Sequence, residues 1–110
     1  MPNEKEIARL ERRLEHEAYG IEYEQKNAGE QIAAALATMQ RFLDDAKQVA
    51  NDPAKTSINK VGGVMHALAW GYANTTSSLE NAMGAYARER TMELERAETL
   101  AVLNAAREAK

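Results

Sequence analysis

His66 and Trp70 are the two side chains of this sequence best suited to chemistry or to tight contact, and they stand four residues apart. Residues four apart lie on one face of a helix, so an imidazole and an indole at these positions can contact each other. Gly62 and Gly63, one turn earlier, leave the imidazole uncovered,. An accessible imidazole transfers a proton or accepts a phosphoryl group, and an indole anchors a protein partner.

The same helix face has a second interpretation as part of a subunit interface. Tryptophan commonly supplies buried contact area, and neighbouring glycines permit a close approach of two helices. A junction between subunits is also a place where a small ligand can bind. The sequence therefore predicts a partner-binding or oligomer face and leaves open which of the two it is. The candidate residues are Gly63, His66, Trp70, Asn74 and Ser77.

The run from His66 to Gly71 resembles the His-x-Leu-Lys-Gly motif of histidine phosphotransfer domains. It reads His66-Ala67-Leu68-Ala69-Trp70-Gly71, with Ala69 at the lysine position and the glycine one residue later. The resemblance implies a four-helix bundle in which His66 carries the phosphoryl group. A histidine-phosphotransfer-like signalling protein using His66 is therefore one alternative function.

Other catalytic and metal-binding patterns are missing from the sequence. There is no cysteine, which excludes disulfides, thiolate nucleophiles and thiolate metal sites,. A carboxylate-bridged metal pair in a helical bundle needs a glutamate three residues before a histidine. Arg13 stands at that spacing before His16, and Gly63 before His66. Since phosphate-binding loops and serine-nucleophile motifs are missing as well, we predict a non-enzymatic protein without cofactor or metal.

Charge is nearly balanced, with 17 acidic and 14 basic side chains and a net charge of -3. A basic row on the first helix runs beside an acidic row, which is typical of a solvated, salt-bridged helix surface. A nucleic-acid-binding regulator that uses Lys5, Arg9 and Arg12 of this row is the alternative interpretation,. The basic row comprises Lys5, Arg9, Arg12 and His16, and the acidic row comprises Glu4, Glu11, Glu15 and Glu22.

Neither export nor membrane insertion is predicted. The first six residues are charged and lead directly into a helical pattern,. The longest compact apolar run, residues 32–37, is too short to cross a bilayer,. The default expectation is a cytoplasmic protein.

Two long helices are predicted on either side of a turn at Asn51-Asp52-Pro53, because proline disfavours helical geometry in the residue before it,. Asn3, with Glu6 three residues later, predicts an N-cap and a first helix that begins near Glu4,. Thr56 or Ser57 is expected to cap the second helix,.

Each predicted helix contains a weak point. Gly20 and Gly29 favour a kink or break in the first helix between them, because glycine disfavours helix interiors,. Ser77 and Glu80 form a possible capping box, which favours a break in the second helix near Asn74–Ser77,.

Apolar residues recur at helical spacing along both segments and predict the buried faces. Those of the first helix are Ile7, Leu10, Leu14, Ala18, Ile21, Ala28, Ile32, Ala35, Met39, Leu43, Ala46 and Ala50. Those of the second are Ile58, Val61, Met65, Leu68, Tyr72, Leu79, Met83 and Tyr86. Trp70, Met92 and Leu103 fall outside this second row and are expected on the back of the second helix.

The predicted architecture is a single all-α domain over residues 1–110, a long antiparallel helical hairpin that resembles a coiled coil. A bare hairpin of this length buries only one side of each helix, which is marginal for stability. We therefore expect an oligomeric helical bundle, with a homodimer favoured. The predicted function is a protein–protein interaction module, either a small adaptor, a regulator or an inhibitor, that occupies the surface of a protein partner.

Overall fold

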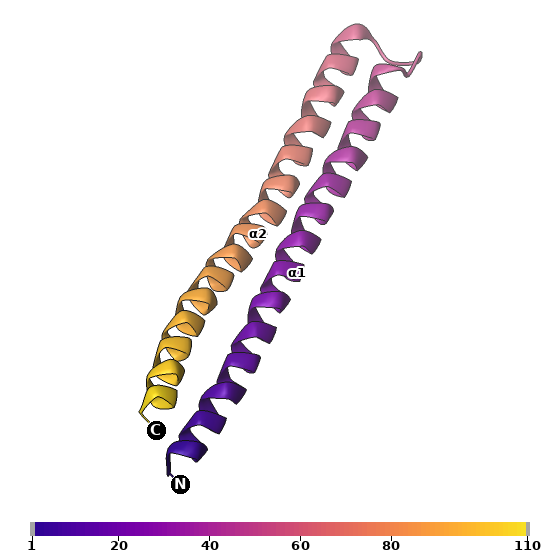
Figure 1. The fold of residues 1–110 in the computed structure, drawn as a ribbon. Coiled ribbons are helices and arrows are strands. Elements are labelled where there is room, and N and C mark those ends of the chain that lie inside the picture. The colour runs from indigo at the N-terminus through magenta and orange to yellow at the C-terminus, as the bar shows by residue number, and fades with distance from the viewer. Residues whose placement is uncertain (1, 110) are drawn as a thin grey trace. The chain divides into compact units, whose positions relative to one another are not determined.

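The computed structural model describes residues 2–109, with side chains from residue 3 onward. These residues form two α-helices and no strand: α1 is Pro2–Ala50 and α2 is Ser57–Glu108 (Figure 1). The predicted all-α class with two long helices is confirmed. Contacts divide the chain into two compact units. The turn unit spans Gly29–Met83, and the terminal unit combines the residues up to Ala28 with those from Gly84 onward.

The predicted turn is present between Ala50 and Ser57. The Asp52 carboxylate accepts a hydrogen bond from the backbone nitrogen of Ala54 at 3.0 Å, which closes a local turn,. Thr56 caps α2, since its hydroxyl accepts from the backbone nitrogen of Asn59 at 3.4 Å,. These local polar contacts confirm the expected turn and N-cap. Figure 1 shows the turn as the short link between the two helices.

The first residues of α1 differ from the prediction. The helix already includes Pro2, which suits proline because the first helical positions do not use their backbone N–H groups,. Asn3 therefore lies inside the helix rather than at its cap. Its side-chain nitrogen donates to the backbone oxygen of Ala106 at 3.1 Å and so joins α1 to α2 within the terminal unit.

The predicted breaks are wrong, because both helices are continuous, and the alternative of a kink without a break stays a prediction. α1 passes through Gly20–Gly29, and α2 passes through Asn74–Ser77. In α2 the side-chain nitrogen of Asn74 donates to the backbone oxygen of Trp70, and the Thr76 hydroxyl donates to that of Tyr72, each at 2.8 Å. These polar side chains bond back to the preceding turn, so they do not terminate the helix.

In the turn unit, α1 and α2 pack against each other through a row of mostly small side chains, which we call the seam. Along α2 its buried and half-buried members recur at intervals of three and four residues, as in a heptad repeat,. A β-carbon added to Gly71 would lie 2.8 Å from the Phe42 β-carbon, so the two backbones approach closely. The seam comprises Val64, Ala67, Gly71, Thr75, Ser78 and Ala82 of α2, opposite Ala35, Thr38, Phe42, Ala46 and Val49 of α1.

The predicted buried face of α2 is wrong, because all eight of its residues are exposed. Exposure reaches 80% for Ile58 and 73% for Met83. The small residues of the seam are buried instead, since they let the helices approach more closely than leucine or methionine would. The exposed residues are Ile58, Val61, Met65, Leu68, Tyr72, Leu79, Met83 and Tyr86.

The predicted buried face of α1 is partly correct. Ile32, Leu43 and Ala50 are exposed, so the prediction fails at these three positions of the turn unit. The remaining nine positions are buried or half-buried. They are Ile7, Leu10, Leu14, Ala18, Ile21, Ala28, Ala35, Met39 and Ala46.

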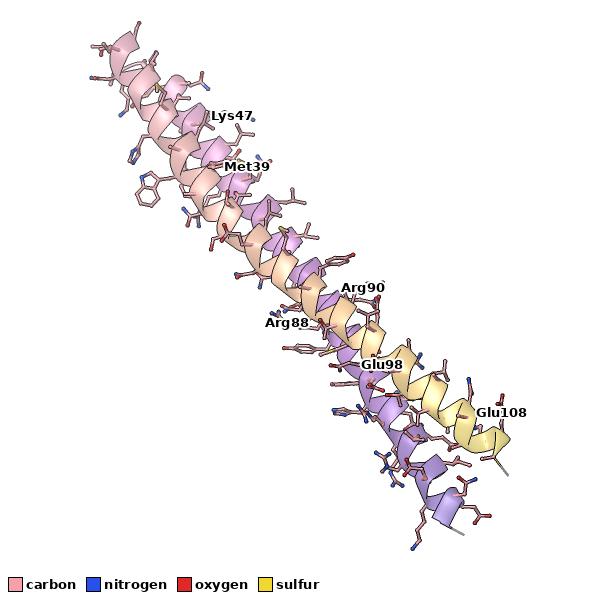
Figure 2. The ribbon with its side chains drawn as sticks, turned by 90° about the vertical axis from the view of Figure 1, so that its left-hand side faces the viewer. Met39, Lys47, Arg88, Arg90, Glu98 and Glu108 are labelled. Atoms are coloured by element: carbon pink, nitrogen blue, oxygen red, sulfur yellow. The ribbon has the colours of Figure 1, made fainter. Side chains whose placement is uncertain are left out.

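The terminal unit has a small apolar core followed by polar contacts. Ile7, Leu10 and Leu103 form the buried cluster, so Leu103 faces inward and not outward as expected. Further along, the Thr99 hydroxyl donates to the buried Glu17 carboxylate at 3.2 Å. Other cross-helix contacts are the Arg88–Glu24 ion pair and the Arg107–Glu11 pair at 3.1 Å (Arg88 is labelled in Figure 2). The N-terminal part of α1 and the C-terminal part of α2 therefore pack together in the terminal unit.

Candidate interaction surfaces

An apolar flank lies directly beside the seam on α2. Each of several seam residues is followed in sequence by a large apolar residue, one step of 100° around the helix,. Met65, for example, follows Val64, and Tyr72 follows the buried Gly71. The other such pairs are Ala67 with Leu68, Ser78 with Leu79 and Ala82 with Met83.

The same arrangement occurs on α1. Leu36 follows the buried Ala35, and Leu43 follows the half-buried Phe42. The two helices of the turn unit are antiparallel (Figure 1). In each helix the next residue is rotated by about 100° around the helix axis, and because the two axes run in opposite directions, the residues that follow the seam lie on the same side of the helix pair. A shallow hollow bordered by Ala50 of α1 and by Val61 and Met65 of α2 agrees with this placement.

These residues together form the apolar stripe of the turn unit, and none of them is charged. Their exposed fractions range from 38% for Leu43 to 80% for Ile58. Ten large apolar side chains exposed to this extent present on the order of 1,000 Å² of surface,. Monomeric proteins rarely carry an apolar patch above about 300–600 Å². The stripe comprises Ile32, Leu36, Leu43, Ile58, Val61, Met65, Leu68, Tyr72, Leu79 and Met83.

The sequence does not predict this stripe as a candidate surface. Its α2 members are predicted to lie in the core, and Leu36 belongs to neither predicted face. The sequence does carry a signal, because alanine, glycine or serine immediately precedes six of the ten stripe residues: Leu36, Ile58, Leu68, Tyr72, Leu79 and Met83. That pattern places two apolar sides next to each other on one helix, and only the smaller side permits close helix packing.

Four residues of the sequence-predicted face lie on the opposite flank, because each of them precedes a seam position in the sequence: His66, Trp70, Asn74 and Ser77. His66 and Trp70 contact each other as predicted, with ring centroids 6.1 Å apart and ring planes at 70°. Trp70 is 54% exposed, and His66, Asn74 and Ser77 are also exposed. Gly63 is half-buried, and a β-carbon there would lie 2.5 Å from a Val49 methyl group. Four of the five residues therefore form an accessible group, and its role as a binding face stays a prediction.

The residues that resemble a phosphotransfer motif occupy two different environments. The His66 ring is exposed next to Trp70, whereas Gly71 is buried in the seam against Phe42. Close packing of the two helices accounts for Gly71 without reference to phosphate chemistry. Transfer of a phosphoryl group to His66 stays a prediction.

The basic row of α1 is exposed at Lys5, Arg9 and Arg12, and one of its members is engaged by an acidic neighbour. Arg9 donates to Glu6 through two nitrogens, at 3.1 and 2.6 Å. The hydrogen bond from Arg9 holds the pKa of the Glu6 carboxyl below its usual value. A phosphate ligand at Arg9 would have to compete with this carboxylate.

We expect the Arg9→Ala variant to raise the pKa of Glu6 toward its usual value, because the donated hydrogen bond and the positive charge are both removed. The measurement is an NMR pH titration that follows the side-chain carboxyl carbon of Glu6. Arg12→Ala is the matched control and should leave the Glu6 titration unchanged. An unchanged midpoint in Arg9→Ala would show that the pair does not persist in solution.

Within residues 2–109 no group of three or more acidic, histidine or cysteine side chains is arranged to hold a metal ion. The described helices also include none with the length and apolar character needed to span a membrane. No family model, no curated protein and no solved structure matches the chain.

Proposed function

We propose that the chain is a non-enzymatic protein–protein interaction module, either a small adaptor, a regulator or an inhibitor, that acts by covering a partner with its apolar stripe. The observation that carries the proposal is the exposure of ten large apolar side chains on one side of the turn unit. Leaving this surface in water is unfavourable by roughly 25 cal/mol for each Å². A protein surface that covers the stripe therefore gains free energy on binding.

The shape of the stripe favours a helical partner. Two adjacent antiparallel helices form a shallow groove between their apolar flanks, and an amphipathic helix packs into such a groove through residues spaced by three and four. The hollow at Ala50, Val61 and Met65 offers a place for one apolar anchor of this kind. The group around Trp70 offers less apolar area, since its neighbours His66, Asn74 and Ser77 are polar.

The experiment compares proteins captured by cross-linking in cells that express tagged variants. Met65→Glu places a charge in the stripe, and Trp70→Glu places one on the opposite flank. Both residues are exposed in the single chain, so neither charge is placed against the seam, and circular dichroism shows whether each variant keeps its helices. We expect Met65→Glu to lose the partners captured by the wild type and Trp70→Glu to retain them. The reverse pattern would assign binding to the flank of Trp70, and identical capture by all three proteins would contradict the proposal.

A further inference from the structure

We infer that the apolar stripe of one chain is covered by the same stripe of a second copy, so that two turn units form a four-helix bundle. This inference rests on the proposed function, because it takes the stripe to be a protein-binding surface, and it names the partner. A contact of this kind is isologous, which means that the same residues occur on both sides of a two-fold axis.

The area of the stripe matches what such a dimer needs. A stable protein interface buries about 800 Å² on each partner, and the stripe presents on the order of 1,000 Å². Its residues extend from Ile58 to Met83 on α2 and from Ile32 to Leu43 on α1, so they can form one continuous contact. Two such surfaces placed face to face enclose the large apolar side chains of all four helices, which is the usual construction of a four-helix bundle.

The seam buries little apolar surface, so the folded chain needs the second copy for its stability. Buried seam residues such as Ala35, Ala67 and Ala82 carry a single methyl group, and Gly71 carries none. Each buried methyl contributes only about 0.8 kcal/mol, so most of the apolar surface of the turn unit is still outside the seam. A chain whose apolar surface lies mostly outside its own helix contact buries most of that surface by association, as obligate homodimers do. A second copy is the one partner that is made together with every chain.

The charges around the stripe favour a protein over a membrane. Peripheral membrane helices bind through an apolar face bordered by rows of lysine and arginine. The turn unit contains four basic residues, Arg41, Lys47, Lys55 and Lys60, and five acidic ones, Glu30, Asp44, Asp45, Asp52 and Glu80. Its net charge of -1 therefore provides no attraction to an anionic bilayer,.

The proposed dimer leaves Trp70 outside the interface, because Trp70 lies on the opposite side of the seam from Tyr72. Trp70 is the one tryptophan of the chain, so its fluorescence reports on its environment without interference. In this dimer its emission stays that of a hydrated indole. A dimer built on the sequence-predicted face around Trp70 would instead bury the indole and shift its emission to shorter wavelength.

The test combines sedimentation equilibrium with tryptophan fluorescence over a dilution series. We expect the wild type to sediment at twice its 12.2 kDa mass with an exposed, readily quenched Trp70. Met65→Ala and Tyr72→Ala should each weaken the dimer by about tenfold or more, as truncation of an interface anchor does. Trp70→Ala is the matched control and should leave the dissociation constant unchanged within about twofold.

Met65→Glu should dissociate the dimer fully or unfold it, and thermal melts distinguish these cases. If the dimer is obligate, the wild-type melting temperature rises with protein concentration. A helical wild-type monomer at every concentration would overturn the inference, as would a dimer weakened by Trp70→Ala and insensitive to the stripe variants. A monomer that binds neutral phospholipid vesicles through the stripe would also overturn it and would identify a membrane as the occupant. Capture of a different protein through the stripe would still support the proposed function, so the two proposals fail separately.

Discussion

Leu103→Ala is expected to lower the free energy of unfolding by about 2–5 kcal/mol. Leu103 is 1% exposed and belongs to the buried cluster of the terminal unit with Ile7 and Leu10, and Leu14 and Ala106 pack against that cluster. Removing three carbon atoms from its side chain leaves a cavity that two long helices cannot collapse without losing their other contacts. Chemical denaturation followed by circular dichroism measures the loss as a lower urea midpoint.

Leu100→Ala is the matched control for this prediction. Leu100 lies three residues earlier on the same helix and is 40% exposed, so the identical truncation removes side-chain surface that already contacts water. We expect a cost of under about 1 kcal/mol at this position. Equal losses from the two variants would show that the Ile7, Leu10 and Leu103 cluster is not packed in solution.

Local features of the fold were predictable because short-range chemistry determines them. Proline at position 53 and the polar residues before it give the turn, and the Thr56 hydroxyl caps α2. The contact between His66 and Trp70 followed from their spacing alone. In each case residues within a few positions of one another settle the structure, so no knowledge of tertiary packing was needed.

The buried side of each helix was predictable only where apolar residues occur on a single side. Ile7, Leu10 and Leu14 have charged neighbours around them on α1, so they had no competitor for the interior. On α2 the row of large residues competes with an adjacent row of alanine, glycine and serine. Hydropathy favours the burial of the large residues, whereas close packing of the two helices favours the burial of the small ones. The structure buries the small row and leaves the large row exposed.

Gly71→Ala is expected to destabilise the protein by about 1–3 kcal/mol, as overpacking of a filled core does. The new methyl carbon would lie 2.8 Å from the β-carbon of Phe42 and 3.2 Å from its γ-carbon. The β-carbon is bonded directly to the backbone, so Phe42 cannot avoid the clash by changing its rotamer. The two helices must move apart instead, which weakens the neighbouring contacts of the seam. Denaturation followed by circular dichroism measures the effect.

Gly62→Ala is the matched control. We expect the change in the free energy of unfolding to have opposite signs in the two variants. Gly62 is exposed, and a β-carbon there has no neighbouring atom within 4 Å. The substitution should therefore stabilise the protein by about 1 kcal/mol, the difference between alanine and glycine in a helix interior. If the row from Ile58 to Tyr86 were the buried side of α2, Gly71 would not face Phe42, and alanine at position 71 would stabilise the helix as well. Opposite signs at positions 62 and 71 thus locate the seam on the small residues and leave the large apolar row free to bind.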